Sequence, residues 1–130
     1  MKPTSRRILI VDDEPSLLRM MSLYLDRLGY SVTATDATDK AWAMVEADPS
    51  AVDIAVLDGS MDGMSMEELA SRLLSSNPAL CILTASGYPV DMTALSAKAG
   101  GRVAFLLKPF TPQSLAAAVG GLLAAQEKGL

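Results

Sequence analysis

The chain has 130 residues, half of them apolar and a fifth charged, which is the balance of one globular domain of ordinary size. Its net charge of -4 argues against a nucleic-acid partner, because phosphate backbones are bound by clustered lysine and arginine. The chain has no histidine, which excludes a Ser-His-Asp triad, a Cys-His pair and a histidine zinc site. No apolar run approaches the roughly 20 residues that span a membrane, and the basic start lacks the apolar stretch of a secretory signal. We therefore expect a cytoplasmic protein without a membrane partner, whose chemistry uses carboxylates, lysine and hydroxyls.

The first half of the chain alternates between segments of strand and helix character. Ile8 to Val11 is a continuous apolar run, which predicts a strand covered on both faces of a parallel sheet. Ser16 to Leu28 repeats leucine and methionine with a helical period, and Gly29 favours a stop at its end. Ser31 to Thr35 alternates in polarity, which predicts an edge strand, and Ala37 to Glu46 is expected to form the next helix.

The second half of the chain continues this alternation. Three further apolar runs, Ile54 to Leu57, Leu80 to Leu83 and Val103 to Leu107, predict strands covered on both faces. Ser65 and Glu68 have the spacing of a capping box at the start of a helix. The other helices are expected from about Pro89 and from Thr111. Strict alternation of strand and helix predicts right-handed crossovers and a doubly wound α/β sheet with helices on both faces.

Polar residues follow four of the predicted strands, at the edge where a parallel sheet binds its ligands. They are Asp12, Asp13 and Glu14, then Asp58, then Thr84, then Lys108. Any one of them alone is more often a turn or cap residue. Together, carboxylates without histidine or cysteine indicate Mg²⁺, and an ammonium group beside a metal can hold phosphoryl oxygens. Because aspartate is a competent nucleophile toward phosphorus, the set predicts phosphoryl transfer to a carboxylate.

Four short motifs make the chain resemble the receiver domain of two-component response regulators over essentially its whole length. They are Ile8 to Glu14, Val56 to Asp58, Leu83 to Ala85 and Lys108 to Phe110. The resemblance implies a flavodoxin-like sheet of five parallel strands in the order 2-1-3-4-5 with five helices. It also implies one receiver domain over 1–130, with a core of about 6–125 and no output domain. The phosphoryl group would come from a sensor histidine kinase or a histidine phosphotransfer protein, and a downstream protein would read the result. Such a domain is no enzyme beyond its own Mg²⁺-dependent phosphorylation and dephosphorylation.

The resemblance also assigns roles to single residues at the strand ends. Asp58 is expected to be the phosphoacceptor. Mg²⁺ would be bound directly by Asp13, Asp58 and the backbone carbonyl of Ser60, with Asp12 helping through a water molecule. Lys108 would contact the phosphoryl group.

Two further residues match the switch positions of the family. Thr84 would turn its hydroxyl toward the phosphoryl group, and Phe105 matches the aromatic switch, although an ordinary core aromatic is the alternative. The state would be read on the face formed by the fourth helix, the fifth strand and the fifth helix. Because phenylalanine lacks the hydroxyl of tyrosine, we expect its inward state to be populated without phosphate. The Lys108-Pro109 peptide bond is expected to be cis, as the family turns the chain there.

The loop after the phosphoacceptor departs from the family pattern. Met61 is followed by Asp62 instead of proline, and Met66 stands where glycine is usual. We expect added negative charge and a freer loop, which would alter its geometry and the rate of dephosphorylation. Met61, Met64 and Met66 either fill gaps in the hydrophobic packing or form a soft partner-binding patch.

Several alternative functions remain compatible with the same residues. The chain could be a receiver fold that binds proteins without phosphorylation, or the excised receiver of a larger regulator or hybrid histidine kinase instead of a stand-alone receiver. Ala85 to Pro89 and Val103 to Thr111 resemble receivers attached to hybrid histidine kinases, which suggests a role in a phosphorelay. A phosphatase with an aspartate nucleophile would need a second aspartate two residues further on, where Ser60 stands. A nucleotide-binding or flavin-binding module is disfavoured because the chain has neither a G-x-G-x-x-G turn nor a P-loop lysine motif.

Overall fold

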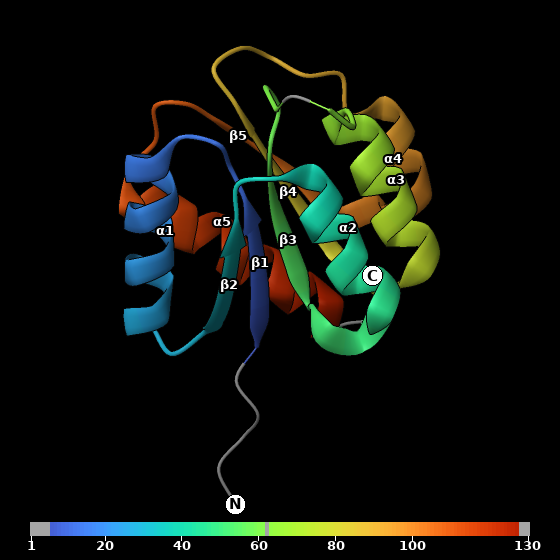
Figure 1. The fold of residues 1–130 in the computed structure, drawn as a ribbon, viewed down its shortest axis with the longest axis horizontal. Coiled ribbons are helices and arrows are strands. Elements are labelled where there is room, and N and C mark those ends of the chain that lie inside the picture. The colour runs from blue at the N-terminus through green and yellow to red at the C-terminus, as the bar shows by residue number, and fades with distance from the viewer. Residues whose placement is uncertain (1–5, 62, 128–130) are drawn as a thin grey trace, which may run out of the picture.

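The computed structural model describes residues 6–61 and 63–127, and in these residues strands and α-helices alternate five times (Figure 1). The strands are β1 (Arg7–Val11), β2 (Ser31–Thr35), β3 (Ile54–Asp58), β4 (Cys81–Ser86) and β5 (Val103–Leu107). The helices are α1 (Pro15–Arg27), α2 (Thr38–Ala47), α3 (Met66–Ser76), α4 (Thr93–Ala99) and α5 (Pro112–Glu127). All strand pairs are parallel, and their order is β2-β1-β3-β4-β5. The predicted doubly wound sheet and its strand order are therefore confirmed.

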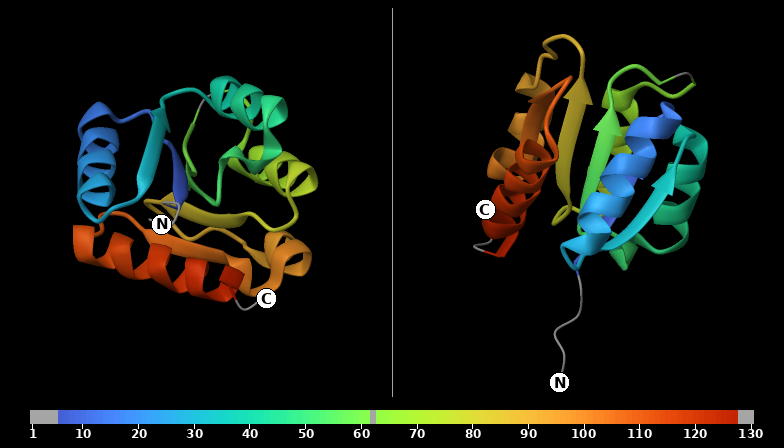
Figure 2. Two further views of the ribbon diagram at one scale, coloured as in Figure 1. Left: turned by 90° about the horizontal axis from the view of Figure 1, so that it is seen from below. Right: turned by 90° about the vertical axis from the view of Figure 1, so that its left-hand side faces the viewer.

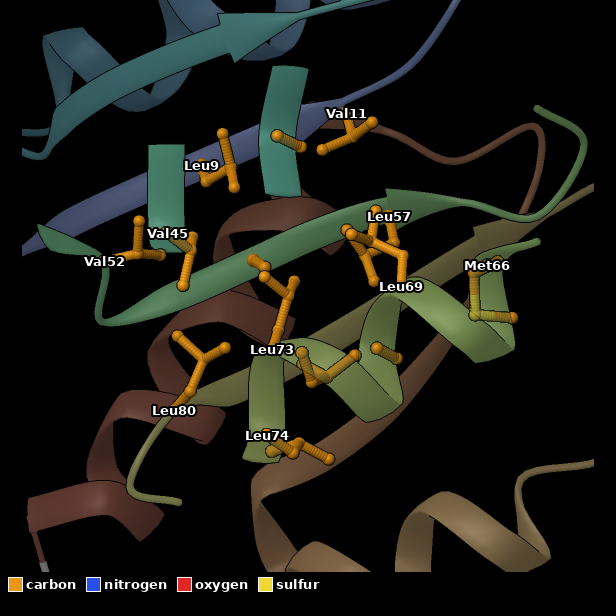
Figure 3. Close-up of a cluster of buried hydrophobic side chains, with 14 of the residues drawn as sticks. Leu9, Val11, Val45, Val52, Leu57, Met66, Leu69, Leu73, Leu74 and Leu80 are labelled. Atoms are coloured by element: carbon orange, nitrogen blue, oxygen red, sulfur yellow. The ribbon is translucent and has the colours of Figure 1, made fainter. Parts of the chain in front are cut away.

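Helices cover both faces of the sheet, with α1 and α5 on one face and α2, α3 and α4 on the other (Figure 2). Successive residues of β1 point to opposite faces: Leu9 packs with α2 and α3, and Ile10 packs with α1 and α5. Figure 3 shows the first of these clusters, where Leu69 and Leu73 of α3 lie against Leu57 of β3. Burial on both faces explains why β1, β3 and β4 read as unbroken apolar runs.

The two edge strands are less buried than the three central ones. β2 lies at one edge, as its alternation predicts. β5 was predicted to be covered on both faces, but it forms the other edge, its residues are half-buried, and Leu107 is 51% exposed. The prediction of full burial was wrong because an apolar run does not show whether a further strand pairs beside it.

The helix ends follow local hydrogen bonds that the sequence only partly predicts. The Ser65 hydroxyl accepts the N–H of Glu68 at 3.1 Å, as a capping box requires, but the Glu68 carboxylate pairs with Arg72 instead of returning to Ser65. α4 begins at Thr93 and not near Pro89, because the Asp91 carboxylate accepts both the N–H and the hydroxyl of Thr93. None of the helices in the described part of the chain has the length and hydropathy that a membrane crossing needs.

The connections after β1, β3, β4 and β5 gather at one edge of the sheet, the upper one in Figure 1. Parallel strands bring their carboxyl ends to the same edge, so residues far apart in sequence become neighbours there. Asp12, Asp13 and Lys108 follow their strands at this end of the sheet, and Asp58 is the last residue of β3. Thr84 instead lies inside β4, which continues to Ser86 and not only to the predicted Leu83.

Candidate functional site

Two carboxylates and one ammonium group meet at the carboxyl ends of three strands. Val11 of β1 pairs with Leu57 of β3, so Asp12 and Asp58, the residues that follow them, come to lie side by side. Lys108, directly after β5, places its Nζ 3.1 Å from the Asp12 Oδ2 and 3.1 Å from the Asp58 Oδ1. The ammonium group therefore bridges residues that lie 96 and 50 positions away in the sequence.

Backbone hydrogen bonds hold each of these groups in place. The Asp12 carboxylate accepts the N–H of Glu14 at 2.9 Å, and the Asp58 carboxylate accepts the N–H of Ser60 at 3.1 Å. The N–H of Lys108 donates to the carbonyl of Ser86 at 2.7 Å. The Lys108-Pro109 bond that follows is cis, as predicted. Asp12 and Asp58 are thus each fixed by a hydrogen bond from the backbone two residues further on, and the backbone of Lys108 is fixed by a hydrogen bond to β4.

The carboxylates of Asp12 and Asp58 are buried, whereas Asp13 is exposed. Burial raises the pKa of Asp12 above its usual range, although the N–H of Glu14 and the ammonium group of Lys108 oppose the shift. Partial burial disfavours the charged form of Lys108, but the hydrogen bonds to both carboxylates outweigh it and raise the pKa of Lys108. The charges at this edge are therefore strongly coupled.

Three carboxylates at the carboxyl end of the sheet can hold a metal ion. One carboxylate oxygen from each of Asp12, Asp13 and Asp58 lies within 4.8 Å of the other two. Among the described residues, no other three carboxylates come this close together. Hard oxygen ligands suit Mg²⁺, which needs few protein ligands because it keeps several waters. The exposure of Asp13 leaves one side of the group open to water. The donor set therefore fits a magnesium ion.

The predicted switch residues lie beside this centre but do not contact it. Thr84 is buried in β4, and its hydroxyl donates to the sulfur of Met92 and to the carbonyl of Ala104, both at 3.4 Å. Phe105 pairs with Thr84 across the sheet, is half-buried and belongs to neither buried cluster of the described residues. The Thr84 hydroxyl is thus directed toward β5 and the start of α4.

Two residues of the site were missed by sequence reasoning. The Ser86 side chain is buried at the end of β4, where its hydroxyl accepts the N–H of Tyr88 at 3.3 Å. A Cβ added to Gly59 would stand 3.1 Å from the Cβ of Ser86, which is tighter than an ordinary van der Waals contact, so the glycine allows the loop after Asp58 to approach β4 closely without strain. The one available signal was the glycine that directly follows the predicted nucleophile.

The methionines of the loop after β3 divide between core and surface. Met66 is buried in the cluster of Figure 3, so it fills space in the hydrophobic packing. Met61 and Met64 are half-buried and pack against the same cluster. Asp62, to which the sequence assigns added charge near the site, lies outside the described residues.

Curated relatives share the sequence of this domain. The chain is 30% identical to the chemotaxis protein CheY1 of Helicobacter pylori, over 84% of this chain and 90% of that protein. It is 30% identical to the DNA-binding transcriptional regulator NtrC of Rhizobium meliloti, over 93% of this chain but 25% of that protein. The chain thus spans a quarter to a half of several curated relatives that it matches.

Solved structures share the fold. A response regulator receiver domain protein from Methanospirillum hungatei matches with a TM-score of 0.85 at 26% identity, over 98% of this chain and all of that one. The response regulator TrrA of Thermotoga maritima, solved in complex with Mg(2+)-BeF, matches with a TM-score of 0.76 at 25% identity, over 90% of this chain and 98% of that one. The sequence profile of the response regulator receiver domain matches residues 8–120. The chain therefore belongs to the family of response regulator receiver domains, which are phosphoacceptor modules of two-component systems.

Proposed function

We propose that the chain takes a phosphoryl group from the phosphohistidine of a partner protein onto Asp58. The observation that supports this most is the Lys108 ammonium group, held 3.1 Å from both Asp12 and Asp58. In the reaction an oxygen of Asp58 attacks phosphorus, the bond between phosphorus and the histidine nitrogen breaks, and an acyl phosphate forms. The leaving imidazole keeps the electron pair of the broken bond and takes up a proton from water. The donor would be a sensor histidine kinase or a histidine phosphotransfer protein, and we place the exchange in the cytoplasm.

Residues around Asp58 would prepare it for this attack. Asp13, Asp58 and the carbonyl of Ser60 would hold Mg²⁺ directly, with Asp12 acting through water, and the ion would neutralise charge on the phosphoryl oxygens. Lys108 would contribute a second positive charge to those oxygens. The Ser60 N–H fixes one carboxylate oxygen of Asp58, which leaves the other free to attack. These groups would stabilise developing charge beside the buried carboxylates of Asp12 and Asp58.

Phosphorylation would be transmitted through Thr84 and Phe105. A dianionic phosphoryl group is a stronger acceptor than the sulfur of Met92 or the carbonyl of Ala104, so the Thr84 hydroxyl would turn toward it. The space that Thr84 leaves would admit the ring of Phe105, its neighbour across the sheet. A downstream protein would read the altered face of α4, β5 and α5. Because the ring has no hydroxyl to satisfy, the inward state would also be populated without phosphate.

The phosphoacceptor assignment is tested by intact-mass measurement after incubation with a small acyl phosphate and Mg²⁺. We expect one added phosphoryl group on the wild-type chain and none on Asp58→Asn. Asp13→Ala should lose the dependence of the rate on Mg²⁺, whereas Asp26→Asn, a distant exposed carboxylate, should behave as the wild type. Labelling of Asp58→Asn at the wild-type level would refute the assignment. A wild-type chain that takes no phosphoryl group would instead be a protein-binding module with a fixed surface.

A further inference from the structure

An open pocket of about 570 Å³ lies beside the phosphoacceptor centre, between the β2–α2 and β3–α3 loops. Three carboxylates line it: Asp36 and Asp39 from the β2–α2 segment and Asp13 from the loop after β1. Asp58 and Lys108 do not line it, so the pocket is separate from the bridge described above. No cationic side chain is among the described residues that line it, and its charge is therefore strongly negative.

A hydroxyl with no hydrogen bond to any described residue belongs to a largely buried residue that lines this pocket. Thr38, the first residue of α2, is 5% exposed and lines the pocket. Its Oγ1 points across the pocket toward Gly63, where an added Cβ would stand 3.5 Å away. Within the described parts of the chain, this hydroxyl has no hydrogen bond. Among the described residues the buried side-chain atom without a hydrogen-bond partner is the Arg7 Nε, so the Thr38 Oγ1 is open to the pocket and can form a hydrogen bond with a ligand there.

The spacing of the carboxylates selects the kind of cation. Asp13, Asp36 and Asp39 do not form a group with oxygens within 4.8 Å of one another, whereas Asp12, Asp13 and Asp58 do, so far as the structure describes the chain. A single metal ion needs its ligands that close together. An extended cation with several donors can instead reach acceptors on different walls, as the guanidinium group of arginine does with five N–H groups in one plane.

The remaining wall of the pocket is apolar. Met61 and Met64 are half-buried and line the side formed by the β3–α3 loop. An arginine side chain has an alkyl stem of three methylene groups that can lie along such a wall while its charged end reaches the carboxylates. Thioether side chains adapt to a stem of this shape because they are flexible and polarisable.

We propose that this pocket binds an arginine side chain of a partner protein. Asp36, Asp39 and Asp13 accept hydrogen bonds from the guanidinium group, the Thr38 hydroxyl accepts a further N–H, and the stem packs on Met61 and Met64. Asp13 also belongs to the acidic centre around Asp58, so a partner anchored here stands directly beside the phosphoacceptor. The inference goes beyond phosphoryl transfer, because occupation of the pocket requires no phosphoryl group.

The test is an NMR titration of the ¹⁵N-labelled, unphosphorylated chain with n-butylguanidinium, which has the charged group and stem of arginine. We expect saturable shifts at the amides of Ala37, Thr38 and Gly63, with a dissociation constant in the millimolar range that rises with salt. The neutral isostere n-butylurea should bind at least tenfold more weakly, and n-butylammonium more weakly than the guanidinium. The same titration of Asp58→Asn should be unchanged, which separates this inference from the proposed phosphorylation.

Variants assign the binding to the pocket. The double variant Asp36→Asn with Asp39→Asn should raise the dissociation constant about tenfold, and Asp26→Asn, which removes one exposed carboxylate of α1 outside the pocket, should not change it. Thr38→Val should weaken binding about threefold without lowering the melting temperature, because the hydroxyl that it removes makes no hydrogen bond in the free chain. Equal affinity for n-butylurea, an unchanged affinity in the double variant, or shifts confined to other residues would overturn the proposal.

Discussion

At the scale of a single residue, Asp12 shows how a residue in a functional site can lower the free energy of unfolding. Asp12 is 1% exposed, and the pKa of its carboxyl group is raised. The loss of hydration on burial therefore destabilises the charged carboxylate more than its hydrogen bonds stabilise it. A group whose pKa is higher in the folded than in the unfolded state stabilises the fold only at pH values where it is protonated. At neutral pH the charged Asp12 therefore lowers the free energy of unfolding, as is common for a perturbed group in a functional site.

Asp12→Asn should accordingly raise the free energy of unfolding at pH 7 in buffer without divalent cations. The amide oxygen can still accept the N–H of Glu14, and Lys108 keeps its partner Asp58. The advantage should be absent below about the unperturbed pKa of 3.8, grow as the pH rises through the folded pKa and then stay constant. Urea unfolding at pH 4.5 and pH 7 measures this, with Asp26→Asn as the control. A variant less stable than the wild type at pH 7 would show that the ion pair outweighs desolvation.

At the scale of secondary-structure elements, the site depends on how closely the loop after β3 approaches the end of β4. The N–H of Gly59 donates to the carbonyl of Ala85 at 2.8 Å, which carries the pairing of the two strands one residue beyond Asp58. The side chain of Ser86 fills the space opposite Gly59. The absence of a side chain at Gly59 therefore permits the close packing of the residue after Asp58 against the end of β4.

Gly59→Ala should lower the free energy of unfolding by about 1–3 kcal/mol, because the new methyl group would overlap Ser86 in a packed interior. The added contact is with the Cβ of Ser86, which cannot move without its strand. Gly87→Ala is the matched control, since an added Cβ there meets nothing within 4 Å, and its effect should be close to zero. Chemical denaturation of both variants measures the difference. Equal stability of the two would mean that the β3–α3 loop yields easily.

At the scale of the whole molecule, Asp58, the proposed phosphoacceptor, and the proposed output face lie on different elements joined through β4. The Thr84 hydroxyl is bonded to Met92 at the start of α4 and to Ala104 in β5, so its rotation would release contacts to both elements at once. Coupling of this kind requires two states with different contacts, and these hydrogen bonds define one of them.

Beryllium fluoride with Mg²⁺, added as a phosphoryl analogue, should shift the NMR signals of the Phe105 ring and of α4 along with those of the Asp58 loop. Thr84→Val removes the hydroxyl while keeping the shape of the side chain, and it should leave the loop shifts intact but reduce those of Phe105 and α4 at least twofold. Signals of Phe105 and α4 that stay still in the wild type, while the loop signals move, would place the switch elsewhere.

Much of the site followed from the order of residues along the chain. The alternation of strand and helix requires parallel strands, and parallel strands bring their ends to one edge, so Asp12, Asp58 and Lys108 could be assigned to one site. The resemblance to receiver domains supplied the cis bond before Pro109, which periodicity alone could not give. The close approach of Gly59 to Ser86 was not predictable, because it depends on the register between β3 and β4.

The sequence by itself determined the fold class, the order of the elements and the identity of the acidic group, because these follow from local patterns of polarity and from chain connectivity. It did not determine the end of β4, which was predicted at Leu83 but lies at Ser86, so that Thr84 is inside the strand. Only the tertiary structure decided that β5 is half-buried, that α4 begins at Thr93, and that the Thr84 hydroxyl is bonded to Met92 and Ala104. Only the tertiary structure shows that Thr38 and Met64 line the same pocket. These properties depend on which surfaces meet across the sheet and between loops, and distances between segments remote in sequence are fixed only when the core packs.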